Sequence, residues 1–262
     1  IVVVPIVLVV VYIVIQGIGA ISWEFLTEFP RNGMKEGGIL PALVGTVVLT
    51  FGTAIASIPI SVGAAVYLAE YARDTWLTRA IRMAIVNLAG IPSVVYGLFG
   101  LGLFVLFMGL GTSIVAGSLT LGLMTMPIVI STAEEALLAV PQRFRVVSHS
   151  LGATRWQTVR QVVLPNALPG ILTGVILGLE RAAGETAPIL FTVAAFYLPQ
   201  LPHGPMDQTM ALPYHLYVIS TQVPGMPLEI QYGTALVLLV MVLGMNLVAT
   251  VIRSRFRRRR QW

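Results

Sequence analysis

Residues 83–133 read MAIVNLAGIPSVVYGLFGLGLFVLFMGLGTSIVAGSLTLGLMTMPIVISTA, a run of 51 residues without a single charged side chain. An α-helix needs about 20 apolar residues to cross the roughly 30 Å hydrocarbon core of a bilayer. The run is therefore too long for one crossing. A glycine-rich turn at 109–112 divides it, which predicts transmembrane spans near 86–108 and 113–132.

The rest of the chain repeats this pattern. Hydrophobic residues make up 56% of the sequence and charged residues 10%, whereas soluble domains carry about 25% charged residues. Residues 1–23 and 230–252 also lack charges. Four further spans are predicted, at 1–21, about 39–61, about 168–190 and about 232–252. The predicted fold class is all-α and integral to the membrane, with six transmembrane helices.

Basic residues predict the orientation, because cytoplasmic loops accumulate Lys and Arg. With both termini cytoplasmic, thirteen of the sixteen basic residues face the cytoplasm, Arg31 and Lys35 lie outside, and Arg181 lies within a span. We therefore predict a multi-pass protein of the cell membrane, that is, of a bacterial inner membrane or plasma membrane. Its parts are one transmembrane domain over 1–252, a cytoplasmic loop over 133–167, an extracytoplasmic loop over 197–231 and a cytoplasmic tail over 253–262.

Both ends of the chain are expected to be held at the membrane. Residues 1–23 lack the basic start and cleavage site of a secretory signal and are interpreted as an anchor helix. Because the sequence begins at Ile1 rather than Met, we expect a short N-terminal piece to precede it. The basic tail RSRFRRRRQW would suit nucleic acid, but directly after a span it favours anionic membrane lipid as partner.

No metal or catalytic site is predicted. The chain has no cysteine, which excludes disulfides and thiolate metal sites. The three histidines are scattered along the sequence, at positions 149, 203 and 215, and we expect such lone histidines to be polar surface residues. Asp207 lies near His203, but the intervening Gly204 and Pro205 favour a plain turn.

The loop at 133–167 is patterned. Phe144, Val147 and Leu151 recur at helical spacing, Gly152 interrupts, and a second apolar stripe follows from Trp156 to Val163. Two short amphipathic helices joined by a glycine bend are predicted. They would either lie on lipid or present a compact knob to a cytoplasmic partner.

This loop resembles the signature loop of ABC-importer permeases, which reads Glu-Ala-Ala, three residues, Gly, nine residues, Ile-x-Leu-Pro. Gly152 and the Val162–Pro165 stretch match that spacing, with Val in place of Ile. The usual Glu is Val146 here, and Glu134-Glu135-Ala136 lies too early to replace it. The resemblance implies the type I ABC importer permease fold. It also implies that an ATPase is contacted by the residues Gly152, Ala153, Thr154, Arg155 and Trp156.

Two further stretches, GIPSVVYGLFGLG at 90–102 and ERAAGETAP at 180–188, resemble phosphate-importer permeases, most of all the PstA type. This resemblance implies a phosphate transporter with three kinds of partner: a second permease of the PstC type, an ATPase dimer of the PstB type and an extracytoplasmic phosphate-binding protein. It implies no cofactor in this chain, since ATP and Mg would be bound by the partner ATPase.

The ATPase must be another chain. A P-loop places a lysine in the pattern G-x-x-x-x-G-K-[ST], and the sole lysine, Lys35, has no such pattern around it. Other readings remain open: a permease for sulfate or molybdate, a proton-coupled carrier or channel, or a non-transporting membrane subunit. The spacing from Gly152 to Pro165 counts against a carrier, which needs no knob for an ATPase.

The fifth predicted span carries three charges, Glu180, Arg181 and Glu185, where charged residues are rare and usually functional. Arg181 and Glu185 are four residues apart, so a continuous helix would place them about 40° apart around its axis, with Glu180 about 100° from Arg181. Either these residues form a structural ion pair, or they line a phosphate pathway. In that pathway the planar arginine guanidinium, whose parallel N–H donors act as a fork, would bind the anion. Small residues recur every four positions in the same span, which predicts close packing against another helix: Gly170, Gly174, Gly178 and Ala182.

Overall fold

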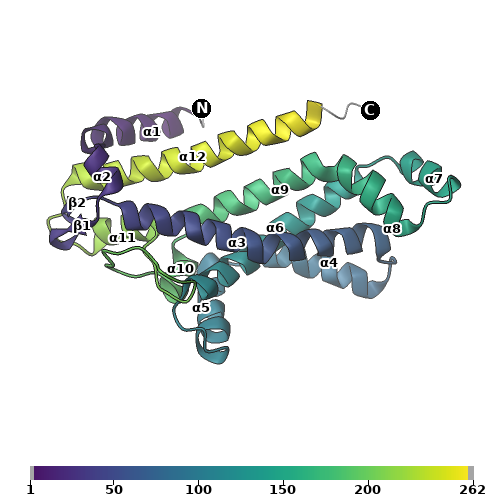
Figure 1. Cartoon of the computed structure of the whole chain (residues 1–262), viewed down its shortest axis with the longest axis horizontal. Coiled ribbons are helices and arrows are strands. Elements are labelled where there is room, and N and C mark those ends of the chain that lie inside the picture. The colour runs from purple at the N-terminus through teal and green to yellow at the C-terminus, as the bar shows by residue number, and fades with distance from the viewer. Residues whose placement is uncertain (1–2, 259–262) are drawn as a thin grey trace. The chain divides into compact units, whose positions relative to one another are not determined.

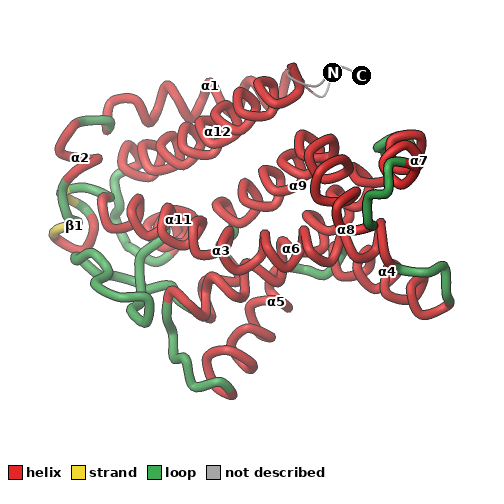
Figure 2. Tube along the Cα trace, turned by 45° about the vertical axis from the view of Figure 1, so that its right-hand side comes forward, coloured by secondary structure: helices red, strands yellow, loops and turns green. Residues whose placement is uncertain are grey.

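The computed structural model of the chain describes residues 3–258, and almost all of its regular structure is helical (Figures 1 and 2). The α-helices are α1 (Val3–Gly17), α2 (Trp23–Thr27), α3 (Leu40–Val66), α4 (Trp76–Ala89), α5 (Ser93–Gly100), α6 (Ile114–Leu138), α7 (Gln142–Ser150), α8 (Arg155–Thr158), α9 (Leu164–Gly184), α10 (Ala187–Thr192), α11 (Leu212–Thr221) and α12 (Leu228–Arg258). Residues 1–2 of the predicted first span and residues 259–262 of the predicted tail lie outside the described residues.

Shorter elements complete the chain. Within residues 3–258, the 3-10 helices are η1 (Ile18–Ala20) and η2 (Asn32–Met34), and the π-helical turns are η3 (Tyr67–Tyr71), η4 (Leu101–Phe107) and η5 (Val159–Val163). The strands β1 (Pro30–Arg31) and β2 (Glu36–Gly37) pair antiparallel around η2. The π-turns matter here because such turns are rare and occur frequently at functional sites.

Several helical stretches are long and apolar enough to cross a membrane. Within residues 3–258 there are four: Leu40–Tyr71, Ile114–Leu138, Arg155–Gly184 and Leu228–Val251. They confirm a multi-pass membrane fold. The helix Val4–Ala20 is shorter, so the number six and the side on which each terminus lies stay predictions.

The third predicted span, 86–108, is not one helix. α4 ends at Ala89, α5 begins at Ser93, and the two are bent by 103°. Pro92 explains the break, because proline has no N–H to donate and restricts the preceding residue away from helical geometry. This pair forms a broken span or a re-entrant loop, so the apolar run predicted near 86–108 is divided at Pro92.

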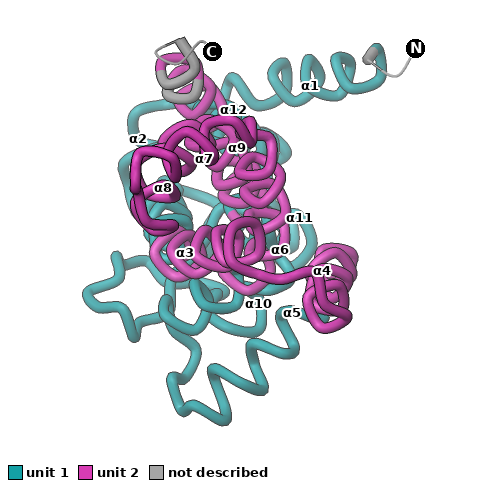
Figure 3. The backbone as a smooth tube through the Cα atoms, turned by 90° about the vertical axis from the view of Figure 1, so that its right-hand side faces the viewer, with its two compact units in different colours: residues 1–52, 93–121, 183–244 teal, residues 53–92, 122–182, 245–262 magenta. Residues whose placement is uncertain are grey.

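The chain divides into two compact units (Figure 3). Unit 1 comprises residues 1–52, 93–121 and 183–244, and unit 2 comprises residues 53–92, 122–182 and 245–262. The helices α3, α6, α9 and α12 contribute residues to both. Unit 1 contains the hairpin, α5, α10 and α11, and unit 2 contains α4, α7 and α8.

Unit 2 is held together by close packing of α9 on α6. A Cβ added at Gly174 would lie 2.7 Å from the Cβ of Thr132, and one at Gly178 would lie 2.9 Å from Val129. Gly170 meets Ala136 even more closely. Only glycine permits this approach, so the predicted small-residue face is confirmed. Its partner is α6.

Candidate functional site

The loop at 133–167 contains the two predicted short helices. α7 ends at Ser150, and Gly152 follows with a φ of +83°. Residues that carry a side chain rarely adopt this backbone conformation. Glycine occupies this region without the steric cost of a Cβ, which explains the residue at the bend. The N–H of Gly152 donates to the His149 carbonyl at 2.9 Å and so closes the end of α7.

The second short helix begins with a capping box. The Thr154 hydroxyl accepts from the N–H of Gln157 at 3.3 Å, and the Gln157 side chain accepts from the N–H of Thr154 at 2.7 Å. This reciprocal pair satisfies two N–H groups that a helix start leaves without partners. The hydroxyls of Ser148 and Thr158 lie 2.8 Å apart and join α7 to α8. The tip is therefore an ordered turn.

Apolar side chains are exposed around this tip. Leu151 is 83% exposed, and Val146, Val147 and Trp156 are each between 56% and 58% exposed. An exposed apolar patch on an ordered loop is typical of a surface that binds another molecule. Val146, at the position of the usual Glu, belongs to this outward-facing patch.

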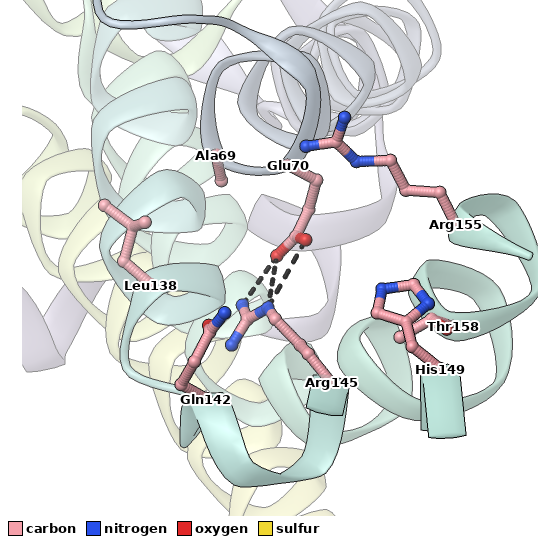
Figure 4. A pocket seen from close by; sticks show the side chains of 8 residues that line it. All are labelled: Ala69, Glu70, Leu138, Gln142, Arg145, His149, Arg155 and Thr158. Carbon is pink, nitrogen blue, oxygen red and sulfur yellow. Dashed lines mark hydrogen bonds and ion pairs between the residues drawn. The ribbon is translucent and has the colours of Figure 1, made fainter. Parts of the chain in front are cut away.

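A buried ion pair lies on the inner side of the same loop (Figure 4). Arg145 Nη2 lies 2.6 Å from Glu70 Oε1, and the two side chains are only 11% and 7% exposed. The remaining donors of Arg145 reach the carbonyls at the end of α6, with Nη1 at 2.5 Å from Val140 and Nη2 at 2.9 Å from Leu137. One guanidinium thus joins α7 to the ends of α3 and α6.

Two more arginines reach the π-turn η3, which carries Glu70. Arg82 of α4 donates to the Leu68 carbonyl at 3.1 Å and to the Glu134 carboxylate at 2.8 Å. The Arg155 guanidinium lies 5.1 Å from the centre of the Tyr71 ring, at cation–π distance. Figure 4 shows Arg145 and Arg155 on opposite sides of the Glu70 carboxylate.

A pocket of about 230 Å³ lies between these groups. It is lined by Ala69, Glu70, Leu138, Gln142, Arg145, His149, Arg155 and Thr158. Among the described residues, no group of three or more His, Cys, Asp or Glu side chains is placed to hold a metal. The arrangement fixes helices to one another.

Sequence reasoning missed this network. Glu70 and Arg145 are 75 positions apart, and nothing in either local pattern pairs them. The available signal was weak: an acidic residue just beyond the predicted second span, where a free carboxylate would lie close to hydrocarbon. Glu134, set aside in the sequence as lying too early for the signature, is the partner of Arg82.

The three charges of the predicted fifth span are placed differently from the expectation. Glu180 and Arg181 lie in the last turns of α9, but that helix ends at Gly184, so Glu185 stands outside it, before α10. The angular relation predicted between Arg181 and Glu185 therefore does not apply. Gly184 lowers helix propensity there, and Pro188 suits the first turn of a new helix. Arg181 in the last turn complements the helix dipole.

Glu180 contacts α12. Its Oε2 accepts from the Asn246 side-chain amide at 3.3 Å, and its Oε1 is buried without a hydrogen-bond partner in the described part of the chain. Asn246 in turn lies 3.3 Å from the Thr250 hydroxyl. Glu180 is thus directed to a helix interface, apart from the loop tip.

Two of the stretches that carry the resemblance meet in unit 1. A Cβ added to Gly97 of α5 would lie 3.0 Å from both the Ala187 carbonyl and the Pro188 Cα, and 2.8 Å from the Phe191 ring. The stretches 90–102 and 180–188 are therefore in contact through backbone. Neither can shift here without the other.

Replacing Gly97 with valine is expected to separate α5 from α10, because backbone atoms cannot yield as side chains do. The phosphate uptake that the resemblance implies should then fall at least tenfold. Gly102→Val is the matched control, since nothing lies within 4 Å of its Cβ position. Uptake per assembled complex measures the effect. Equal uptake by the two variants would contradict the close contact.

The histidines divide into two kinds. His149 and His203 are exposed, as expected, but His215 of α11 is only 2% exposed, so the expectation of a surface residue was wrong there. The Asp207 carboxylate accepts from the N–H groups of His203 and Gly204, each at 2.8 Å. These hydrogen bonds hold the pKa of Asp207 below its ordinary value. The predicted plain turn is confirmed.

Burial lowers the pKa of His215 from 6.5 to about 4. The unfolded chain therefore binds a proton between pH 6.5 and 4 that the folded chain does not, and stability falls as the pH falls through this window. The expected loss is on the order of 3 kcal/mol, complete near pH 4. As the pH falls from 6.5 to 4, the melting temperature in detergent should fall less for His215→Gln than for wild type. The variant His203→Gln, at an exposed position, should behave as wild type. Identical pH profiles for all three proteins would refute a neutral buried His215.

Comparison with known proteins identifies the family. A family described as "Binding-protein-dependent transport system inner membrane component" matches residues 57–262. The chain belongs to this family. Members are transport permeases, so the chain is a transporter subunit of the membrane and not an enzyme, and the ATPase is a separate chain.

Individual relatives of this permease are similar over most of its length. "Probable ABC transporter permease protein YqgI" of Bacillus subtilis is 35% identical, covering 91% of this chain and 85% of the relative. "Phosphate transport system permease protein PstA 1" of Mycobacterium tuberculosis is 36% identical, covering 86% of this chain and 72% of the relative. The probable PstA of Methanocaldococcus jannaschii is 33% identical, covering 92% and 84%. The resemblance to PstA-type permeases is confirmed.

The fold is also known from experiment. An inward-facing structure of the MetNI methionine ABC transporter superposes with a TM-score of 0.68 at 19% identity, covering 83% of the permease and 95% of that chain. At this identity the likeness concerns the fold alone. It confirms the type I ABC importer permease fold.

Proposed function

We propose that this permease is the PstA-type subunit of an ATP-driven importer that moves inorganic phosphate into the cell. The observation that carries the proposal is the identity of 33% to 36% with phosphate transport permeases over 86% to 92% of the chain. The contact between the stretches 90–102 and 180–188 supports it, because both resemble phosphate permeases and form one packed region.

The proposed transporter has four kinds of chain. They are this permease, a second permease of the PstC type, an ATPase dimer of the PstB type that binds ATP and Mg, and an extracytoplasmic phosphate-binding protein. Membrane lipid surrounds the permeases, and nucleic acid has no part. The loop at 133–167 is proposed to lie in the cytoplasm and to contact the ATPase through residues 152–156. Its exposed apolar side chains on an ordered tip support that role.

The substrate pathway is proposed to include Arg181, Glu185 and Glu180. A phosphate that loses its hydration needs a positive partner, and the Arg fork matches its oxygens. Glu185 is proposed to balance the arginine when the pathway is empty, because a buried charge without a counter-charge is costly. Glu180, hydrogen-bonded to Asn246, is proposed to border the pathway at the interface of α9 with α12.

Uptake by the reconstituted four-component transporter tests the proposal. Radiolabelled phosphate should accumulate in proteoliposomes only with ATP and binding protein, and unlabelled sulfate or molybdate should not compete. A complex whose ATPase cannot hydrolyse ATP is the control. Accumulation of sulfate or molybdate in place of phosphate would assign the permease to another oxyanion, and uptake without ATP would indicate a carrier.

A further inference from the structure

The π-turn η3 is contacted from three helices. Arg82 of α4 binds the Leu68 carbonyl, Arg145 of α7 binds Glu70, and Arg155 of α8 stacks on Tyr71. A π-turn widens the helix and shifts its hydrogen-bond register, so that local groups are available to other partners. The end of α3 therefore receives contacts from both helices of the loop at 133–167.

Arg145 makes the most demanding of these contacts. Its Nε lies 3.1 Å from Glu70 Oε1, its Nη2 lies between that carboxylate and the Leu137 carbonyl, and its Nη1 lies 2.5 Å from the Val140 carbonyl. A planar guanidinium with fixed donor directions can satisfy all three acceptors at once, whereas a lysine ammonium is a point charge. The contact therefore fixes the orientation of α7 as well as its distance.

The direction of Arg145 also determines what α7 presents outward. Arg145 is turned inward to Glu70, while the next two residues, Val146 and Val147, are exposed. The carboxylate that the family signature places at position 146 is absent. The ion pair of this loop is instead internal, with Glu70 of η3 as the acid.

We infer that Arg145 and Glu70 are positioning residues for energy coupling: they fix the loop tip to the ends of α3 and α6, so that these elements move as one body. This inference rests on the proposed contact between the loop and an ATPase. A role in stability alone is the weaker account, because a buried ion pair gains little over a well-packed apolar pair, whereas its geometry is specific.

The first test replaces Arg145 with lysine in the reconstituted transporter, which keeps the charge and removes the fork. Assembly and basal ATP hydrolysis should stay near wild type, while phosphate moved per ATP should fall about tenfold, within the usual range of coupling between sites. Arg79→Lys is the matched control, because Arg79 forms an exposed pair with Asp74 in the same unit. The inference would be overturned if Arg145→Lys moved as much phosphate per ATP as wild type, or if this variant failed to assemble.

The second test needs no substitution in the network. The chain has no cysteine, so spin labels at Tyr67→Cys and Ser150→Cys, both exposed positions, report the distance between η3 and α7. In the assembled transporter this distance should be the same without nucleotide and with bound ATP. A distance that changes between the two states would overturn the inference. Failure of the proposed function would show separately, as a wild-type complex that moves no phosphate.

Discussion

Arg181→Gln is expected to lower phosphate uptake by about a hundredfold or more while the transporter still assembles. Glutamine keeps hydrogen bonding but removes the charge, and each charged hydrogen bond contributes about 1.5–3 kcal/mol, so the loss of two has this order of effect. Phosphate uptake is measured beside the yield of intact complex. Arg160→Gln is the control, because Arg160 is an exposed arginine of η5, just before α9.

Other substitutions in the same stretch separate the two interpretations. Arg181→Lys should restore uptake only in part, because an ammonium lacks the fork. Glu185→Gln should impair release or gating more than assembly, and Glu180→Gln should have the mildest effect. If Arg181→Gln assembles and transports as wild type, the pathway is wrong. If it does not assemble, these residues form a structural ion pair instead.

Gly152→Asp is expected to leave the permease inserted in the membrane but to abolish ATPase association or coupled uptake. The φ of +83° penalises any Cβ by about 1–2 kcal/mol, and nothing lies within 4 Å of the Cβ position, so crowding is not the cause. The aspartate also adds a negative charge at the exposed tip. Pull-down of the ATPase and uptake per complex measure the loss.

Two variants isolate the reason for that loss. Gly152→Asn tolerates the same backbone better than most residues and adds no charge, so it should retain more ATPase binding. Gly109→Asp places the same residue at another glycine with positive φ, +66°, and no neighbour within 4 Å. It should leave coupling intact. Normal uptake in Gly152→Asp at normal expression would refute the role of the tip.

Much of the fold was predictable because the membrane restricts what a chain can do. Charge-free runs predicted helices, the recurrence at Gly170, Gly174 and Gly178 predicted a packing face, and Gly152 predicted the bend. What the sequence did not reveal depends on distant partners. The pair Glu70–Arg145 joins residues 75 positions apart, and hydropathy does not distinguish a broken helix at Pro92 from a kinked one.

In the candidate pathway, the sequence also failed to predict how two residues only four positions apart are placed. The apolar run continues past Gly184, so the sequence predicted one helix and one face for Arg181 and Glu185. The helix in fact ends between them. The family signature located the loop tip correctly because its spacing is fixed, but it carried no information about Glu70, which lies far outside it.

The π-turn η3 makes chain length itself critical at the end of α3. A π-turn holds one residue more than the α-helical turn it replaces. Deleting a single residue from Tyr67–Tyr71 would return the segment to α-helix and close the widened turn, which would move the Glu70 carboxylate from the position in which it faces Arg145. Homologous permeases that couple in this way should therefore tolerate substitutions in η3 far more readily than a change in its length.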